Sequence, residues 1–166
     1  METTIIDAYN LMHKISELRL LLAQSQDACV DAMVSKLHSH FFGRGLKVVL
    51  VFDGAGKNMS MYNNIDVKFA ITNVGPDYGN ADELIKHLID KARNTKLVTV
   101  VSSDREVSDY AKDRRCRIQS AESFWGAVKD RRTERADAYR ESKEKPDVVT
   151  RTEYDYLLKE FTKKKK

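Results

Sequence analysis

The sequence predicts an α/β fold in which helices cover both faces of a mainly parallel sheet. Strand-like and helix-like segments alternate along the chain, an order typical of parallel sheets. The two clearest strands, 46–53 (LKVVLVFD) and 96–103 (KLVTVVSS), are apolar runs rich in valine, as expected for strands covered on both faces. Three of the expected strands also run into an aspartate: Asp7, Asp53 and Asp104.

The first half of the chain is predicted to hold three strands and two helices. In order these are strand 3–7, helices 13–25 and 27–42, strand 46–53 and the weaker strand 65–73. In the second helix apolar side chains recur every four residues, which places one stripe toward the core: Cys29, Met33, Leu37 and Phe41. The GRG that follows is typical of a helix end, and the Gly- and Asn-rich stretch before the third strand indicates a loop.

The second half is predicted to hold two strands and four helices. In order these are the amphipathic helix 81–92, strand 96–103, helix 105–114, the brief strand 116–118, a long charged helix 121–144 and a C-terminal helix 151–162. The turn-forming GPDYGN precedes the first of these helices, and Pro146 separates the last two. The long charged helix mixes both signs at helical spacing, which favours an exposed, salt-bridged helix.

Composition indicates one globular domain with a charged surface. The 166 residues are 42% hydrophobic and 33% charged, with a net charge of +4 and a pI near 9.0. Four of the positive charges lie in the terminal lysines 163–166, so the basic balance is only weak support for a polyanionic partner. No apolar run approaches the roughly 18 residues of a membrane span. We expect a cytoplasmic protein with no membrane partner, or an organellar one after removal of a targeting segment.

The strand-terminal aspartates predict an acidic site. In open parallel sheets ligands bind beyond the carboxyl ends of the strands, where Asp7, Asp53 and Asp104 are expected. Asp82 and Glu83 begin a helix that faces the same edge. Carboxylates gathered there repel one another, and a bound Mg²⁺ or Mn²⁺ would relieve that repulsion. The four histidines are scattered along helices, so nothing favours a zinc site.

Helix capping is the simpler alternative for some of these residues. Ser103 with Glu106, and Asn80 with Glu83, fit capping boxes. Asp7 fits a cap less well, because the first helix is expected to start several residues later. Asn10 is equally compatible with a turn residue and with an outer ligand of a metal site.

Several segments together resemble the YacP-type branch of NYN domains, which belong to the PIN-like ribonuclease group. They are IIDAYNL, VVLVFDGAG, NADELIKHLI, VVSSDREVSDYA and CRIQSAESF, in the order and spacing expected of that branch. The resemblance implies a PIN-like three-layer sandwich. It divides the chain into a nuclease core at 1–125, a charged helical extension of the same domain at 126–162 and a basic tail at 163–166.

The resemblance further implies a metal-dependent endoribonuclease that uses Mg²⁺ or Mn²⁺. Its substrate would be single-stranded RNA, mRNA above all, and some members of the branch are linked to ribosome-associated mRNA cleavage. The acidic site carried over is Asp7, Asp53, Asp82 and Asp104, with Asn10 and Ser103 as supporting polar groups. Of these we expect Asp7, Asp82 and Asp104 to hold the metal, with Asp53 at the rim. The branch often continues ADERIE where this chain has ADELIK, so Lys86 stands in place of an outer acid.

Basic residues near the strand ends are candidates for RNA contacts: Lys14, Lys57, Arg105, Arg131 and Arg132. A PIN-like fold that binds RNA or the ribosome without effective catalysis is the main alternative function, and Lys86 leaves it open. A haloacid-dehalogenase-type phosphotransferase is disfavoured, because it needs an acid two residues after the first aspartate, where Tyr9 stands.

Overall fold

The computed structural model describes residues 1–61, 64–72 and 76–130, which belong to one compact unit, Met1–Arg131. Six strands form a single sheet in the order β3-β4-β2-β1-β5-β6. Their bounds are β1 Thr3–Asp7, β2 Lys47–Ala55, β3 Met59–Met61, β4 Ile65–Ile71, β5 Val98–Val101 and β6 Arg117–Gln119. All neighbouring strands are parallel except β3, which pairs antiparallel with β4. The expected mainly parallel sheet is therefore confirmed.

The register of the parallel strands brings their carboxyl ends to one edge. Asp7 of β1 is opposite Val51 of β2, and Ile6 is opposite Val101 of β5. On the far side of β5, Val101 is opposite Gln119 of β6. We call this side of the sheet the carboxyl edge, and the side where the strands begin the amino edge.

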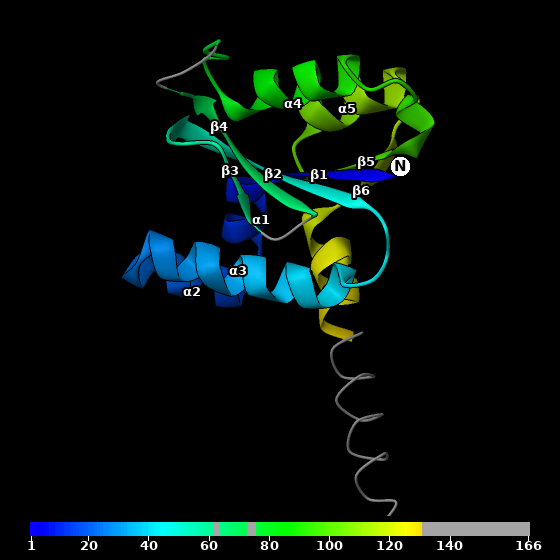
Figure 1. Cartoon of the computed structure of the whole chain (residues 1–166). Helices are drawn as coiled ribbons and strands as arrows, with labels where there is room; N and C mark the ends of the chain where they lie inside the picture. Colours follow the sequence, from blue (N-terminus) through cyan, green and yellow to red (C-terminus); the bar gives the residue numbers. More distant parts are fainter. Residues whose placement is uncertain (62–63, 73–75, 131–166) are drawn as a thin grey trace, which may run out of the picture. The chain divides into compact units, whose positions relative to one another are not determined.

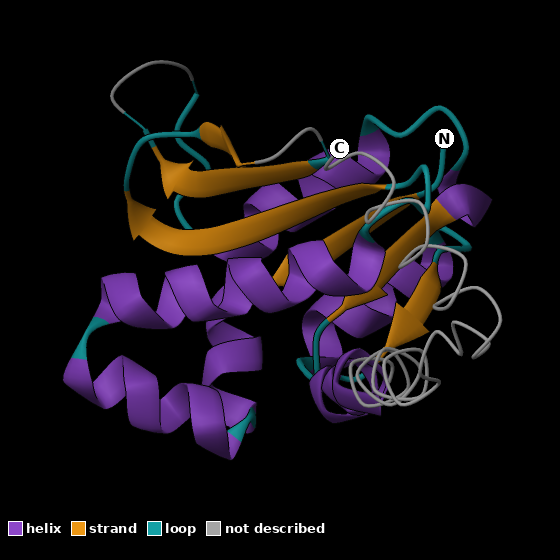
Figure 2. Cartoon of the chain, turned by 60° about the horizontal axis from the view of Figure 1, so that its bottom comes forward, coloured by secondary structure: helices purple, strands orange, loops and turns teal. Residues whose placement is uncertain are grey.

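Helices cover both faces of this sheet (Figures 1 and 2). The helices are α1 Ala8–Lys14, α2 Ser16–Gln24, α3 Gln26–Phe41, α4 Ala81–Asp90 and α5 Arg105–Asp113, with a 3₁₀ turn η1 at Thr95–Leu97 and a further helix over 121–130. Figure 1 places α4 and α5 on one face and α1, α2 and α3 on the other. The three-layer arrangement expected from the sequence is confirmed.

Each face of the sheet has its own apolar core, which is why the central strands are apolar on both sides. On the face of α1–α3, the stripe of α3 packs with Leu50, Phe52 and Trp125. On the opposite face, Val49, Val51 and Val100 pack against apolar side chains of α4 and α5. Burying these side chains supplies most of the stabilisation, at about 25 cal/mol per Å² of apolar surface.

The structure corrects two expectations in the first half of the chain. The single helix expected at 13–25 is two helices, because α1 begins at Ala8 and ends where Ile15 adopts extended backbone. The stretch before β4, expected as a loop, contains the short strand β3. The long charged helix is present over 121–130, while its remainder, the expected helix 151–162 and the basic tail lie outside the described residues.

Within the described ranges, no helix has both the length and the apolar character needed to cross a membrane.

Candidate functional site

Asp7 lies at the junction of β1 and α1. Its side chain is only 7% exposed. It is the N-cap of α1, because the Asn10 backbone N–H donates to Asp7 Oδ1 at 3.0 Å. The expectation that Asp7 is too far from a helix to cap one was therefore wrong. Capping uses one carboxylate oxygen, and the Ser102 hydroxyl donates to the other, Oδ2, at 3.2 Å.

The junction of β5 and α5 supplies the second group of polar side chains. Asp104 is the N-cap of α5, and its Oδ1 accepts from the backbone N–H groups of Glu106 and Val107. The capping box expected between Ser103 and Glu106 is therefore replaced by this Asp104 cap. The Ser103 hydroxyl instead donates to Glu122 and accepts from the Ala121 N–H, both in the helix over 121–130.

Hydrogen bonds join these two junctions, which are far apart in the sequence. The Ser103 backbone N–H donates to Asn10 Oδ1 at 2.9 Å. Ser102, which is buried, donates to Asp7 and accepts from the Asp104 N–H at 3.1 Å. The two strand–helix junctions are thus fixed to each other through Asn10 and Ser102, and Asp7 and Asp104 are held on either side of the same serine.

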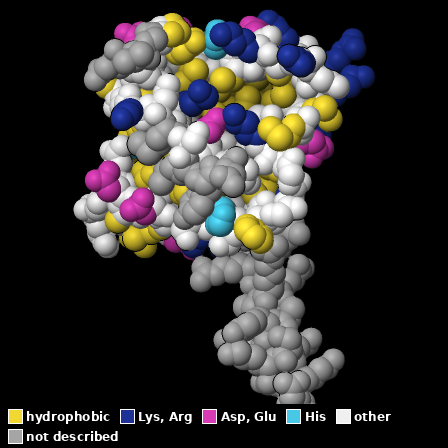
Figure 3. Space-filling model, viewed as in Figure 1, with side chains coloured by type: hydrophobic (Ala, Val, Ile, Leu, Met, Phe, Trp, Pro, Cys, Tyr) yellow, Lys and Arg dark blue, Asp and Glu magenta, His cyan; other side chains and the backbone are white. Residues whose placement is uncertain are grey.

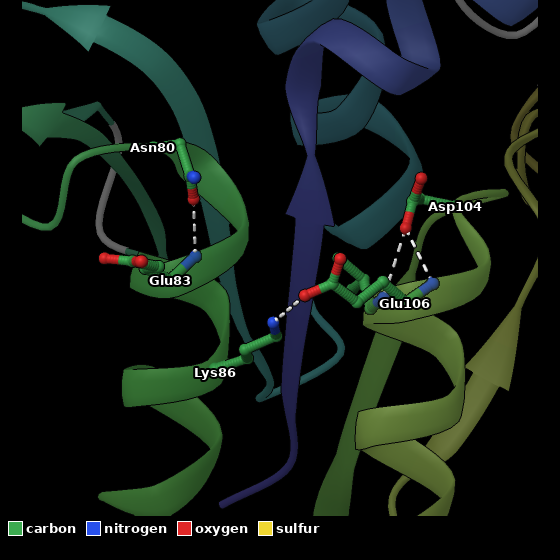
Figure 4. A network of polar contacts seen from close by, with 6 residues as sticks. Asn80, Glu83, Lys86, Asp104 and Glu106 are labelled. Carbon is green, nitrogen blue, oxygen red and sulfur yellow. Dashed lines mark hydrogen bonds and ion pairs between the residues drawn. The ribbon is translucent and has the colours of Figure 1, made fainter.

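The N-terminus of α4 brings Asp82 to the same region. Asn80 caps this helix by accepting from the Glu83 N–H at 2.9 Å, as the sequence predicted. In Figure 4, α4 and α5 lie on either side of the end of β1, and Lys86 of α4 points toward Glu106 of α5. Lys86 and Glu106 form an ion pair between the two helices.

Asp53 lies closer to the rim than the other aspartates. It is exposed, and its Oδ1 accepts from the Gly54 N–H at 2.9 Å. The pairing of β2 with β4 shifts register between Phe52 and Ala55, and Gly54 has φ +79, a left-handed conformation that favours glycine. This bulge interrupts the ladder at the point where Asp53 leaves it.

The acids of the carboxyl edge act on one another electrostatically. Burial raises the pKa of the Asp7 carboxyl, hydrogen bonds from Asn10 and Ser102 lower it in part, and the charges of Asp82 and Asp104 raise it further. Burial also raises the pKa of Asp82, with added contributions from Asp104 and Glu106, while Lys86 acts in the opposite direction. Asp53 adds a smaller contribution of the same sign. The site therefore gathers negative charge that it does not fully compensate.

This donor set suits a hard divalent cation, which prefers oxygen ligands and would relieve the repulsion. Asp7, Asp82 and Asp104 offer only carboxylate oxygens, with hydroxyl and carboxamide groups beside them. However, no three or more His, Cys, Asp or Glu side chains of the described residues converge closely enough to hold an ion directly. The residues fit a cation such as Mg²⁺ that keeps part of its water shell, and they do not form a compact cage of protein ligands.

The candidate RNA contacts are distributed around this edge. Lys14 is in the last turn of α1, Lys57 follows β2, and Arg105 is the first residue of α5, next to Asp104; all three are exposed. Arg131 and Arg132 lie outside the described residues. On the face seen in Figure 3, Lys and Arg side chains gather over the half of the molecule formed by α4, α5 and the sheet.

Two features of the site were not predicted. Ser102 was missed in favour of its neighbour Ser103, and only the strand register decides which of the two faces Asp7. The Lys86–Glu106 ion pair was also missed, although both residues were noted separately. Lys86 follows Asp82 by four positions, which places both on one side of α4, and that spacing is visible in the sequence.

Comparisons with known proteins agree with this architecture. No curated protein matches the chain. A crystal structure of Rae1 (YacP) from Bacillus subtilis has a TM-score of 0.64 at 22% identity, covering 98% of this chain and 94% of that one. A crystal structure of a point mutant of the same protein has a TM-score of 0.68 at 22% identity, covering 90% and 88%. The sequence model of the YacP-like NYN domain family matches residues 4–165 of this chain. The chain therefore belongs to the YacP-like NYN domain family, a family of PIN-like ribonuclease domains.

Proposed function

We propose that this chain is a metal-dependent endoribonuclease that hydrolyses single-stranded RNA at the carboxyl edge. The observation that carries the proposal is that, in a chain of this family, hydrogen bonds join the junctions that hold Asp7 and Asp104, and the charges of Asp82 and Asp104 raise the pKa of Asp7. Three separate segments supply these acids, and the fold keeps them together although their repulsion opposes folding. Such an arrangement is typical of sites that bind a ligand or carry out chemistry.

The substrate itself is a polyanion, so the acids cannot receive it without positive charge between them. Asp7, Asp82 and Asp104 would hold one or two Mg²⁺ or Mn²⁺ ions, in part through water. When bound, such a cation activates a water molecule and neutralises charge on the phosphodiester. The products would carry 5′-phosphate and 3′-hydroxyl ends.

The remaining polar groups would position the acids and the substrate. Asn10 and Ser102 hold the two junctions together, and Ser103 connects them to the helix over 121–130. Asp53 would act from the rim. Arg105, exposed at the start of α5, is next to Asp104 and suits a contact with the RNA backbone, and Lys14 and Lys57 would extend that basic contact.

mRNA is the substrate class that we propose, with the ribosome as a partner. An unstructured strand fits an open edge better than a duplex does, because a single-stranded backbone can turn a phosphodiester toward the acids. Arg131 and Arg132 would contribute to binding in this proposal.

Cleavage of a labelled single-stranded RNA pool by the purified chain tests the proposal. We expect cleavage with Mn²⁺ or Mg²⁺, none with EDTA, and a loss of about 100-fold or more in Asp7→Asn. Glu2→Gln is the matched control, because Glu2 is an acid at the amino edge, paired with Arg117. Equal activity in both variants would overturn the assignment of the site.

The lack of a compact set of protein ligands among the described residues favours a second candidate, an adaptor that binds RNA or the ribosome without effective cleavage. The same experiment separates the two functions. RNA binding by the wild-type chain without metal-dependent cleavage would support the adaptor, and metal-dependent cleavage lost in Asp7→Asn would exclude it.

A further inference from the structure

Lys86 is a cation placed among the acids of the carboxyl edge. It lies one turn after Asp82 on α4, so both side chains project from the same side of the helix. Its ammonium pairs with the Glu106 carboxylate on α5, as Figure 4 shows, and it lies 5.7 Å from the centroid of the Tyr110 ring. The Lys86 side chain is 23% exposed, whereas that of Glu106 is 71% exposed.

Lys86 lies beside the site and not only beside its ion-pair partner. It projects from α4 one turn after Asp82 and reaches Glu106 of α5, two residues after Asp104. Its ammonium therefore lies between the two helices that begin next to Asp82 and Asp104. The hydrogen bond to Glu106 raises the pKa of Lys86, so the ammonium stays charged.

A second ion pair joins the same two helices at their other end, which provides an internal reference. There Asp90 of α4 accepts from Arg114, the C-cap residue of α5, at 3.1 Å, and the Tyr110 hydroxyl also donates to Asp90. In this pair at the amino edge, α4 supplies the acid and the end of α5 supplies the base. In the Lys86–Glu106 pair the roles are exchanged, so the base is on α4, the helix that carries Asp82.

We propose that Lys86 is a built-in counter-cation of the acidic site. It compensates the charge of Asp82 and, through its pair with Glu106, joins the two helices that begin next to Asp82 and Asp104, and so positions the site before a divalent cation arrives. The same charge repels an incoming cation, so Lys86 weakens divalent binding. This assignment rests on the proposed function, because it concerns the same acids.

Cation binding tests the repulsive part of this role. We would titrate the full chain with Mn²⁺ and follow binding by calorimetry in the wild type, Lys86→Met and Arg114→Met. Lys86→Met removes a positive charge and frees the Glu106 carboxylate, so we expect Mn²⁺ to bind about tenfold more tightly. Arg114→Met also breaks a pair between α4 and α5, but far from the acids, and should change the affinity by less than about twofold. An affinity of Lys86→Met within the range of Arg114→Met would overturn the proposal.

Thermal unfolding in EDTA tests the compensating part without any metal. Lys86→Met should lower the Tm by about 2–4 °C. Adding Asp82→Asn should restore most of that loss in the Lys86→Met background, and should shift the Tm differently in the wild-type background. Equal shifts in both backgrounds would show that Lys86 does not compensate Asp82 and would overturn the proposal.

The two tests fail independently of the proposed function. A wild-type chain that neither binds Mn²⁺ nor cleaves RNA would overturn the metal-dependent nuclease, while the unfolding cycle in EDTA would still decide the role of Lys86. A wild-type chain that cleaves RNA with an unchanged Mn²⁺ affinity in Lys86→Met would overturn the role of Lys86 alone.

Discussion

Acidic side chains occur at both edges of the parallel sheet, but their surroundings are opposite. At the amino edge each of three acids is paired with a base: Glu2 with Arg117 at 2.6 Å, Asp66 with Lys47 at 2.7 Å, and Asp90 with Arg114 at 3.1 Å. At the carboxyl edge, none of the ion pairs among the described residues includes Asp7, Asp53, Asp82 or Asp104.

The difference also appears in the pKa values. Partial burial would raise the pKa of Asp66, but hydrogen bonds from Lys47 and Ser60 outweigh it, so that the pKa is lowered. The pKa values of Asp7 and Asp82 are raised by burial and by neighbouring acids. An acid whose pKa is lowered, such as Asp66, stabilises the fold when ionised, whereas an acid whose pKa is raised, such as Asp7 or Asp82, destabilises it when ionised. Acids that oppose folding are the ones to test for function.

The largest expected contrast lies within one helix, because α4 has an aspartate near each end. Asp82→Asn should reduce RNA cleavage by about 100-fold or more, since it removes a proposed cation ligand. Asp90→Asn should leave cleavage within about twofold of the wild type, because it weakens only exposed contacts with Arg114 and Tyr110 at the other edge. Rates measured on the same RNA at saturating Mn²⁺ provide the comparison, and similar losses in both variants would contradict it.

The second contrast concerns two serines that donate to aspartates. Ser102→Ala should lower the free energy of unfolding by about 1–3 kcal/mol, because it leaves Asp7 Oδ2 and the Asp104 N–H without a partner in a buried place. Ser60 donates to Asp66 at 2.7 Å at an exposed site, so Ser60→Ala should lower it by less than about 0.5 kcal/mol. Urea unfolding at neutral pH measures both changes. Equal losses in the free energy of unfolding would mean that the buried hydrogen bonds of Ser102 add no more stability than the exposed one of Ser60.

The third contrast is in the direction in which stability changes with pH, and it begins with Asp7. The pKa of the Asp7 carboxyl is raised in the folded state. Its contribution to stability is therefore full below the unfolded pKa and is lost as the pH rises through the folded pKa. Asp7→Asn keeps the capping oxygen and removes the charge, and should therefore stabilise the chain at pH 7 by about 1 kcal/mol. Unfolding curves at pH 7 and near pH 4 should show this gain shrinking in acid; a destabilised variant at pH 7 would refute the expectation.

Asp66 should behave in the opposite way and by the smallest amount. Its pKa is lowered in the folded state, so its contribution is present above the unfolded pKa and is lost as the pH falls through the folded value. Asp66→Asn should destabilise the chain at pH 7 by about 0.5–1 kcal/mol, and the difference from the wild type should vanish in acid. The same pair of unfolding curves tests this. A loss that persists in acid would mean that Asp66 acts through packing.

Much of the architecture could be predicted from the sequence, because the signals were physical and local. Valine-rich runs at 46–53 and 96–103 indicate strands buried on both faces, and a parallel sheet then brings their carboxyl ends together. The helix start at Ala8 was missed, since its cap is the same Asp7 that was interpreted as a ligand. The break at Ile15 was missed because neither Gly nor Pro marks it.

The site could be predicted less fully than the fold. That Asp7, Asp82 and Asp104 lie at one edge follows from a parallel sheet, which the sequence indicated. Their exact separation depends on side-chain directions, which no pattern of residues specifies. Ser102 and Ser103 are adjacent, and side chains of adjacent residues in an extended chain point in opposite directions. Only the observed register therefore shows that Ser102 contacts Asp7 while Ser103 contacts Glu122.

The bonds from Ser102 to Asp7 and from Ser103 to Asn10 span 95 and 93 positions of the chain. During synthesis, most of the polypeptide is therefore made before Ser102 and Ser103 can bond to Asp7 and Asn10. A nascent chain that ends before residue 102 has the Asn10 N–H that caps Asp7 but lacks the Ser102 hydroxyl that binds Asp7 Oδ2. Translation thus delays assembly of the acidic edge until β5 and the residues after it have emerged.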